Sequence, residues 1–341
     1  MNSLINPFSI ETMSIRTDMI VDRAQEVEAL YHRIIERREN ALVTGTFGIG
    51  KTCVLRKFRE QAQSRCGRRL LPVEMEMFSI SEDPSLFLSD VLLALFQKTW
   101  TEVLNQPFSR LLTAVQSPRD VREGLVSSIA SILSLYRLVR PEEVVAQLGR
   151  ETTLGVDKIV KGIVEERSSR TIARGGLKPS EFIHLADELL AILMDHHIEQ
   201  IVIFGDEANH IAPNLEAEIF RKNFEAFSKR NVQFVFTTGE DVMERVPRLQ
   251  DAFPSALQLS AFQSPRVMQD FYSIYLKDLQ ARLSFSDRAT DCIWRISEGF
   301  PREIQRICQS CVDIAAMRGV DLVDIDILMD ACLDSYRMIP R

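Results

Sequence analysis

The sequence predicts an α/β protein: a P-loop three-layer αβα domain with a parallel sheet, a helical insertion, and a C-terminal all-helical lid domain. Three observations lead to this prediction. Short apolar runs alternate with amphipathic helical patterns before residue 100 and again over 179–259, as in parallel sheets covered by helices. Strand patterns disappear over about 100–180, and only helical periodicity follows residue 264.

The N-terminal part is expected to consist of an extended arm and one helix. Residues 1–19 are polar, and we expect them to lie on the body of the protein. Apolar residues with helical spacing then predict a helix over residues 24–38, with Val27, Leu30 and Ile34 on one face. Asp22 is the expected N-cap of this helix.

Alternating patterns define the predicted sheet and its helices. After the apolar run 41–43, they indicate a helix to about Arg65, strands at 70–78, 200–204, 232–237 and 256–259, and helices at 85–99, 179–196 and 216–230. Helices at about 265–283, 287–297, 301–318 and 322–336 complete the chain. We expect every element after residue 264 to be helical.

These patterns divide the chain into three predicted parts: an arm (1–19), an αβα base (20–262) and a helical lid (263–341). The stretch of about 100–180 is long for one connection in a compact sheet, so we interpret it as a helical insertion in the base. It ends in a basic cluster, which is either a solvated face or a contact for DNA or an acidic partner. The cluster comprises Lys158, Lys161, Arg167, Arg170, Arg174 and Lys178.

Composition favours a soluble cytoplasmic protein with no membrane partner. The 341 residues are 45% hydrophobic and 26% charged, without a secretory leader or a long apolar run. The net charge of −7 argues against a protein that coats nucleic acid, although a local basic surface remains compatible with it. The six cysteines are expected to be reduced, and Cys308-x-x-Cys311 lacks the second pair or histidines of a zinc site.

The stretch 41–58, ALVTGTFGIGKTCVLRKF, contains a phosphate-binding P-loop. The pattern G-x-x-x-x-G-K-[ST] follows an apolar strand and opens a helix, which is the context that this motif requires. Glycines allow backbone N–H groups to face phosphate oxygens, and a helix N-terminus favours an anion. Lys51 supplies a charge for the β- and γ-phosphates, and the Thr52 hydroxyl is a ligand for Mg²⁺. The expected nucleotide contacts run from Gly45 through Thr46, Phe47, Gly48, Ile49, Gly50, Lys51 and Thr52 to Cys53.

A second acidic motif follows the apolar strand 200–204. Asp206 and Glu207 stand at its carboxyl end, and we expect this strand to lie next to the P-loop strand, where open α/β sheets bind ligands. There Asp206 would hold Mg²⁺ through water, and Glu207 would polarise the attacking water.

Two further sets of residues are candidates for contacts with the phosphates. Thr237 and Thr238 end a strand, where a hydroxyl would sense the γ-phosphate, or they are there for β propensity alone. Arg302, after Pro301 at the start of a lid helix, would reach back to the phosphates. Arg245 and Arg248 precede the last strand, where either would complete the site of a neighbouring subunit. For each arginine, a surface role is the alternative.

Taken together, these residues resemble an AAA+ ATPase over nearly the whole chain except the insertion. The resemblance is greatest to the branch with origin-recognition ATPases, transposition target-selection ATPases and the ExeA type. The lid segment 296–308, ISEGFPREIQRIC, is similar to the G-x-P-R-x-[IL]-x-x-[LI]-C helix of that branch. Asn6-Pro7-Phe8, followed by Val21, Asp22, Arg23 and Glu26, resembles an N-terminal motif that packs near adenine there and in STAND switches. Asp22 replaces the usual glycine.

The resemblance implies roles for individual residues. It implies Lys51 and Thr52 on phosphate and Mg²⁺, Asp206 on Mg²⁺ and Glu207 as the catalytic base. It further implies Thr237 or Thr238 as sensor 1, Arg302 as sensor 2, and Arg245 or Arg248 as the finger supplied in trans. The chain ends after the lid, so we expect no winged-helix DNA reader of the kind that origin-recognition ATPases carry.

Three hypotheses about function follow. The first is an ATP-hydrolysing, Mg²⁺-dependent switch that forms a homo-oligomeric ring or filament and regulates a DNA-associated process such as transposition or defence. The second is a STAND- or chaperone-like switch that acts on a protein partner. The third is a structural module that holds ATP or ADP with negligible hydrolysis. In the first two hypotheses the protein is a switch, and only ATP has a different affinity for the closed state than for the open state.

Overall fold

The structure is a computed structural model that describes residues 21–75, 193–208, 227–242, 253–276 and 283–337, with single residues between 91 and 99 and between 187 and 191. The predicted arm, the insertion, Arg245, Arg248 and most of the helices predicted at 85–99, 179–196 and 216–230 lie outside these residues. The boundaries of the three predicted parts therefore stay predictions.

The chain divides into two compact units. The first, which we call the phosphate-loop unit, comprises Met1–His32, Val43–Glu60 and Leu257–Arg341. The second, the strand unit, comprises Arg33–Leu42 and Gln61–Ala256. The P-loop and the C-terminal helices thus belong to the same unit.

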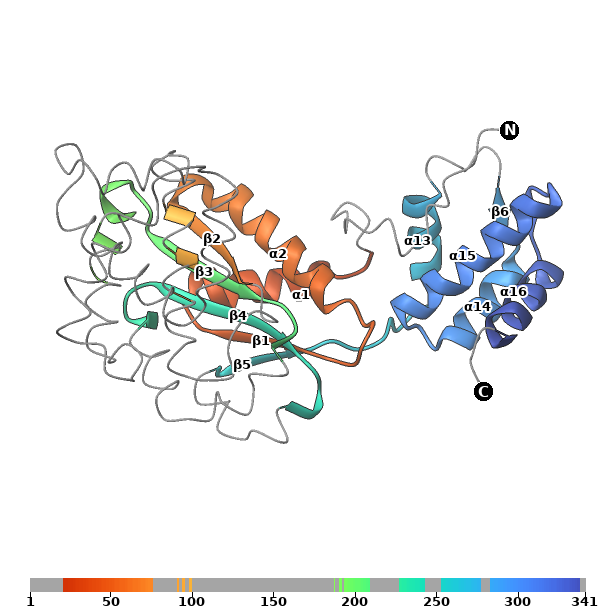
Figure 1. Ribbon diagram of the computed structural model, residues 1–341, viewed down its shortest axis with the longest axis horizontal. Helices are drawn as coiled ribbons and strands as arrows, with labels where there is room; N and C mark the ends of the chain where they lie inside the picture. The colour runs from red at the N-terminus through yellow and green to blue at the C-terminus, as the bar shows by residue number, and fades with distance from the viewer. Residues whose placement is uncertain are drawn as a thin grey trace, which may run out of the picture. The chain divides into compact units, whose positions relative to one another are not determined.

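A five-stranded parallel sheet confirms the predicted fold class (Figure 1). Its strands are β1 (Ala41–Thr44), β2 (Leu70–Met75), β3 (Gln200–Gly205), β4 (Val232–Thr238) and β5 (Ser255–Gln258), in the order β2-β3-β4-β1-β5. β3 pairs in parallel with β2 on one side and β4 on the other. Every residue of β1, β3 and β4 is buried, as expected for parallel strands that are covered on both faces.

The strand order corrects one expectation about the site. β4 lies between β3 and β1, so the strand that ends in Asp206 is not the neighbour of the P-loop strand. The neighbour is the strand that ends in Thr237 and Thr238. Strand patterns identify the strands but not their order, because a helical crossover is long enough to skip one or two positions in a sheet.

Aromatic side chains fill the core of the strand unit around β4. The rings of Phe227 and Phe236 flank that of Phe234 with centroids 5.5 and 5.8 Å away, and Phe253 lies 5.5 Å beyond Phe236. Phe234, Phe236 and Phe253 are completely buried. Such edge-to-face and tilted contacts are the geometries that aromatic quadrupoles favour, so this cluster fixes the position of β4 in the unit.

The first helix is interrupted and capped differently from the expectation. α1 (Ala24–Leu30) continues as a π-helical turn, η2 (Tyr31–Glu36). The N-cap is Arg23, whose side chain makes no capping hydrogen bond to the helix, so the prediction of Asp22 as the cap is wrong. Asp22 instead has a φ of 48°, a left-handed conformation that an Asp adopts at some cost and a glycine adopts readily.

The C-terminal part of the phosphate-loop unit is mainly helical. It contains α13 (Val267–Tyr275), α14 (Asp287–Ser297), α15 (Pro301–Arg318) and α16 (Ile325–Arg337), of which α14, α15 and α16 pack together (Figure 1). Two of its helix ends carry residues that are typical of helix caps. Ser286 accepts a bond from the Ala289 amide at the start of α14, and Gly319 ends α15 in the left-handed conformation.

This part is not entirely helical, which corrects the expectation for residues after 264. β6 (Ser284–Phe285) and β7 (Leu322–Val323) form a two-stranded parallel sheet. Each strand has two residues, too few for an alternating pattern to be visible in the sequence. The Phe285 ring stacks on Tyr272 of α13 at 4.4 Å, so the small sheet ties α13 to the core beside α15.

The six cysteines are free, as expected, and two of them are core residues. Cys308 and Cys311 are buried in the core of the C-terminal helices. Burial raises the pKa of both thiols, to about 12 for Cys311. A protonated thiol is a poor nucleophile and metal ligand, so these side chains serve packing. Among the described residues, no group of three or more candidate ligands is arranged to hold a metal ion.

In the described part of the chain, no helix combines the length and the apolar character that crossing a membrane requires.

Candidate nucleotide-binding site

The P-loop connects β1 to α2 (Lys51–Cys66) as the sequence predicts. Gly45 and Gly48 have φ values of 154° and 81°, which residues with a side chain rarely adopt. A Cβ on Gly45 would lie 2.9 Å from Ile49 Cγ2 and 3.1 Å from the Leu259 carbonyl oxygen. The loop is therefore packed against the chain that follows β5, and only glycine fits there.

Lys51 lies across the loop that precedes it. Its Nζ donates to the carbonyl oxygens of Gly45 at 2.8 Å and Thr46 at 3.0 Å. The ammonium group is thereby held beside the first residues of the loop, at the N-terminus of α2. A positive charge at a helix N-terminus is unfavourable by itself and makes this point strongly attractive to an anion.

Arg302, at the start of α15, lies directly on the P-loop. Its guanidinium carbon is 4.3 Å from the centroid of the Phe47 ring. A Cβ on Gly48 would lie 2.9 Å from both Cβ and Cδ of Arg302. The sequence predicted that Arg302 would reach the phosphates, and the structure brings it to the loop that would bind them.

Arg23 joins three parts of the phosphate-loop unit, a role that the sequence did not reveal. Its guanidinium group pairs with Glu26 at 2.7 Å and donates to the carbonyl oxygens of Ile49 at 3.1 Å and Ser260 at 2.9 Å. It also lies 4.9 Å from the centroid of the Phe262 ring. The residue is only 6% exposed. Its partners are mostly backbone carbonyls, which no residue pattern can indicate.

Replacing Arg23 by Met is expected to lower the free energy of unfolding by about 2–4 kcal/mol, because it leaves two carbonyls and a half-buried carboxylate without their charged donor. Chemical denaturation of the nucleotide-free protein measures this change. Arg33→Met is the matched control, since Arg33 makes one exposed bond of 3.3 Å to the Ala256 carbonyl, and we expect it to cost less than about 0.5 kcal/mol. Equal losses for the two variants would contradict the structural role of Arg23.

In the strand unit, the acidic pair contacts Thr237, the first of the two strand-end threonines. Thr237 Oγ1 donates to Asp206 Oδ1 and accepts a bond of 2.8 Å from the Glu207 amide. Glu207 has a φ of 58°, so its backbone is strained in a way that clusters at functional sites. Thr237 therefore fixes both acids at the carboxyl edge of β3.

Thr238 differs from its neighbour. Its hydroxyl is buried and has no hydrogen-bond partner among the described residues. A buried hydroxyl without a partner is costly, and it needs an explanation such as a ligand or a water molecule. The two threonines that the sequence could not distinguish thus have different environments.

The other candidate residues for nucleotide binding lie in the following elements. Val21 packs into the core of the C-terminal helices, and Pro301 occupies the first turn of α15. Thr52 and Cys53 form the first turn of α2, where both side chains are partly buried. Arg245 and Arg248 lie outside the described residues, so their role as a finger stays a prediction.

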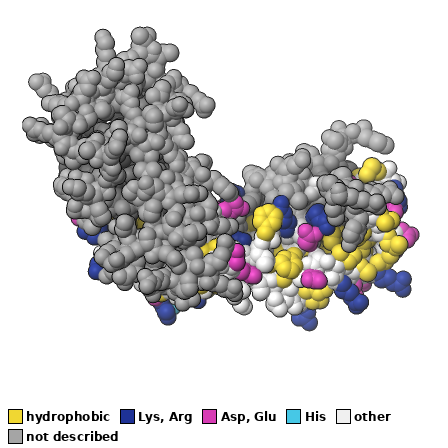
Figure 2. Space-filling view, turned by 60° about the horizontal axis from the view of Figure 1, so that its bottom comes forward, with side chains coloured by type: hydrophobic (Ala, Val, Ile, Leu, Met, Phe, Trp, Pro, Cys, Tyr) yellow, Lys and Arg dark blue, Asp and Glu magenta, His cyan; other side chains and the backbone are white. Residues whose placement is uncertain are grey.

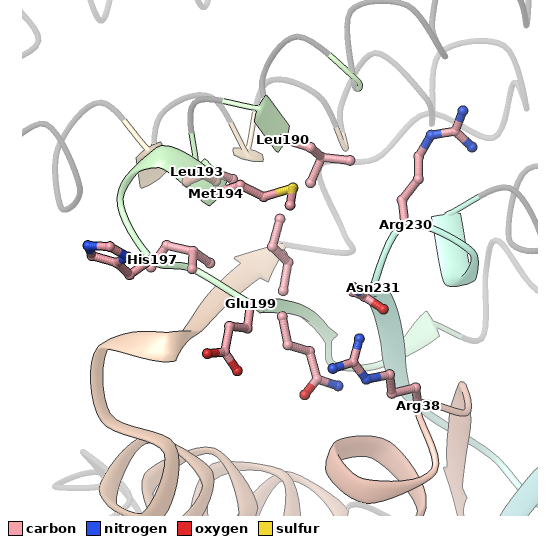
Figure 3. A pocket seen from close by; sticks show the side chains of 11 residues that line it. Arg38, Leu190, Leu193, Met194, His197, Glu199, Arg230 and Asn231 are labelled. Carbon is pink, nitrogen blue, oxygen red and sulfur yellow. The ribbon is translucent and has the colours of Figure 1, made fainter.

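A cavity of about 410 Å³ in the strand unit lies away from these residues. Its lining includes Glu199, Gln200 and Asn231 at the amino ends of β3 and β4, together with Leu193 and Met194. Figure 3 shows the cavity from close by. Asp206 and Thr237 stand at the opposite, carboxyl ends of the same strands. This cavity is therefore separate from the acidic pair.

Comparisons with known proteins agree with the observed fold. Neither a family model nor a curated protein matches the chain. The Aeropyrum pernix ORC2 protein, solved in ADPNP-ADP complexes, matches with a TM-score of 0.54 and 12% identity, covering 98% of this chain and 72% of its own. A structure of Drosophila ORC bound to DNA matches with a TM-score of 0.52 and 12% identity over 97% of this chain.

The chain spans 64% of the length of that Drosophila protein. At 12% identity, these similarities show the fold alone. They confirm the predicted architecture, a parallel αβα sheet followed by a mainly helical part.

Proposed function

We propose that this protein is an AAA+ ATPase that uses Mg²⁺ and ATP to switch between two conformations. The observation that carries the proposal is the position of Arg302, which reaches the P-loop from the first turn of α15. A phosphate chain on this loop would meet Lys51 from α2 and Arg302 from α15. Nucleotide binding would then link the C-terminal helices to the loop. A ligand shifts a conformational equilibrium only when it binds the two conformations with different affinities, and contacts to both α2 and α15 would supply that difference.

The donor groups of this chain fit a magnesium–nucleotide complex. Loop glycines that tolerate no Cβ form a cradle for phosphate, and the hydroxyl and carboxylate oxygens of Thr52 and Asp206 suit Mg²⁺. When bound, Mg²⁺ would neutralise charge on the phosphate oxygens. Lys51 would bind the phosphates, and Thr52 and Asp206 would hold the ion.

The acidic pair would perform the chemistry. Glu207 would take the proton of the attacking water, and its backbone is fixed for this role by Thr237. Because the Thr237 hydroxyl is already hydrogen-bonded to Asp206 and to the Glu207 amide, Thr238 is the better candidate for the residue that senses the γ-phosphate. Its buried hydroxyl has no other partner among the described residues. Arg245 or Arg248 would serve as the finger in a neighbouring subunit of a ring or filament.

We further propose that the switch regulates a DNA-associated process, such as transposition or defence. This is supported by the likeness to ORC bound to DNA and by the basic turn after α2. Arg65 in the last turn of α2, and Arg68 and Arg69 just after it, are all exposed. The net charge of −7 limits DNA binding to such local surfaces.

A protein partner is the second candidate, and a hydrophobic surface favours it. Exposed apolar side chains occupy the end of α15, β7 and one face of α16, and hydrophobic side chains are grouped on the helical part in Figure 2. The exposed apolar side chains are those of Met317, Val320, Leu322, Met329 and Leu333. Exposed apolar groups of this kind, rich in methionine, are typical of protein contacts.

Size measurements with different nucleotides test the switch. With Mg²⁺ and ADPNP, light scattering coupled to size exclusion should show a larger assembly than with ADP or without nucleotide. A 40-base-pair duplex distinguishes the two kinds of partner, since DNA binding should require ADPNP and weaken steeply with salt. Identical mass and elution volume in all three nucleotide states would contradict the proposed switch.

A further inference from the structure

Phe47 is an unusual residue for a phosphate loop. Its side chain is 75% exposed, although an aromatic ring gains free energy from burial. It offers no hydrogen-bond donor to a phosphate. The neighbouring Ile49 of the same loop is buried, so the loop can take up apolar side chains. The exposed ring therefore needs a reason other than loop packing.

The contact that the ring makes is with Arg302. The guanidinium carbon lies 4.3 Å from the ring centroid, within the range of a cation–π interaction. The aliphatic stem of the same arginine lies against Gly48, where a Cβ would be 2.9 Å from Cβ and Cδ. Two consecutive loop residues thus contact Arg302. Gly48 lies against its aliphatic carbons, and Phe47 faces its guanidinium group.

This way of holding an arginine leaves its hydrogen-bond donors available. Among the described residues, no carboxylate pairs with Arg302, whereas Arg306 on the next turn pairs with Glu303 at 2.8 Å. An acidic partner would consume the N–H groups and neutralise the charge. An aromatic ring carries no charge and is a much weaker acceptor than a carboxylate, so the guanidinium group keeps its charge and its capacity to donate to phosphate oxygens.

We propose that Phe47 is a positioning residue, which holds Arg302 over the P-loop and thereby sets the preference of the site for a triphosphate over a diphosphate. The inference rests on the proposed function, in which Arg302 contacts the terminal phosphate. A long arginine side chain loses rotamer freedom when it binds a ligand. The contact with Phe47 has already restricted the side chain before the nucleotide arrives, and preorganisation of this kind increases affinity.

The affinities of ADPNP and ADP, measured with Mg²⁺ by displacement of a fluorescent nucleotide, test this inference. Phe47→Leu removes the aromatic face and keeps an apolar side chain. We expect it to weaken ADPNP binding by about 3–5-fold, in line with exposed cation–π pairs, and to change ADP binding by less than about 1.5-fold. Phe47→Trp retains the face and should restore the wild-type ratio of the two affinities.

A double-mutant cycle with Arg302→Gln separates positioning from a change in the loop itself. In the Arg302→Gln background, Phe47→Leu should have no further effect on the ratio, because there is no cation left to position. An equal loss of ADPNP and ADP binding in Phe47→Leu, or the same loss with and without Arg302, would overturn the inference. Wild-type protein that binds neither nucleotide would overturn the proposed function as well.

Discussion

Replacing Glu207 by Gln is expected to lower the rate of ATP hydrolysis by at least about 100-fold, the usual contribution of a general base. Binding of ATP should change by less than about threefold. The amide of Gln has the shape of the carboxylate but cannot accept the proton of the attacking water. The fold around it should persist, because the bond of 2.8 Å to Thr237 comes from the Glu207 backbone and not from its side chain.

Phosphate release under saturating ATP measures this effect. Glu240→Gln is the matched control, since Glu240 is an exposed acid two residues beyond the end of β4, and the same substitution there should leave turnover unchanged. If Glu207→Gln hydrolyses ATP at the wild-type rate, the assignment of the base is wrong, although the assignment of the P-loop would stand.

Replacing Lys51 by Ala is expected to weaken ATP binding by about 10–150-fold, which corresponds to the loss of one or two hydrogen bonds to a charged group. Lys51 Nζ lies 2.8 Å from the Gly45 carbonyl and 3.0 Å from the Thr46 carbonyl, at the edge of the loop. These two neutral acceptors are partly exposed to water, so the folded state should lose less than about 1 kcal/mol.

Titration with a fluorescent ATP analogue measures the affinity, and thermal unfolding without nucleotide measures the stability. Lys57→Ala, on the same helix but away from the loop, is the control and should retain wild-type binding. An Lys51→Ala variant that binds ATP normally would show that the phosphates are not held by this loop.

The sequence was sufficient to predict the elements that depend on local patterns. β1, the P-loop glycines and α2 appear at the predicted residues because a buried strand, a glycine-rich turn and a helix each leave a clear signal. The apolar runs of β3 and β4 were equally clear. The acids and threonines at their carboxyl ends follow, since parallel strands place these ends on one edge of the sheet.

Features that depend on distant contacts were not predictable. The position of β4 between β3 and β1 depends on the geometry of the crossover connections. Arg23 donates to backbone carbonyls that lie 26 and 237 positions away along the chain. The left-handed φ of Asp22 overrides the preference of an aspartate for the N-cap. Thr237 and Thr238 have the same sequence signal, and only their different partners in the folded protein distinguish them.

Phosphate release by the wild-type protein with ATP, in the presence and absence of Mg²⁺, tests the central claim most directly. The proposed function, with Lys51 and Arg302 on the phosphates and Glu207 as the base, predicts steady turnover that requires Mg²⁺. It also predicts that turnover at subsaturating ATP falls in Lys51→Ala. Turnover that is absent from the pure protein with ATP, Mg²⁺ and duplex DNA, or that persists unchanged in Lys51→Ala, would contradict an ATPase built on this P-loop.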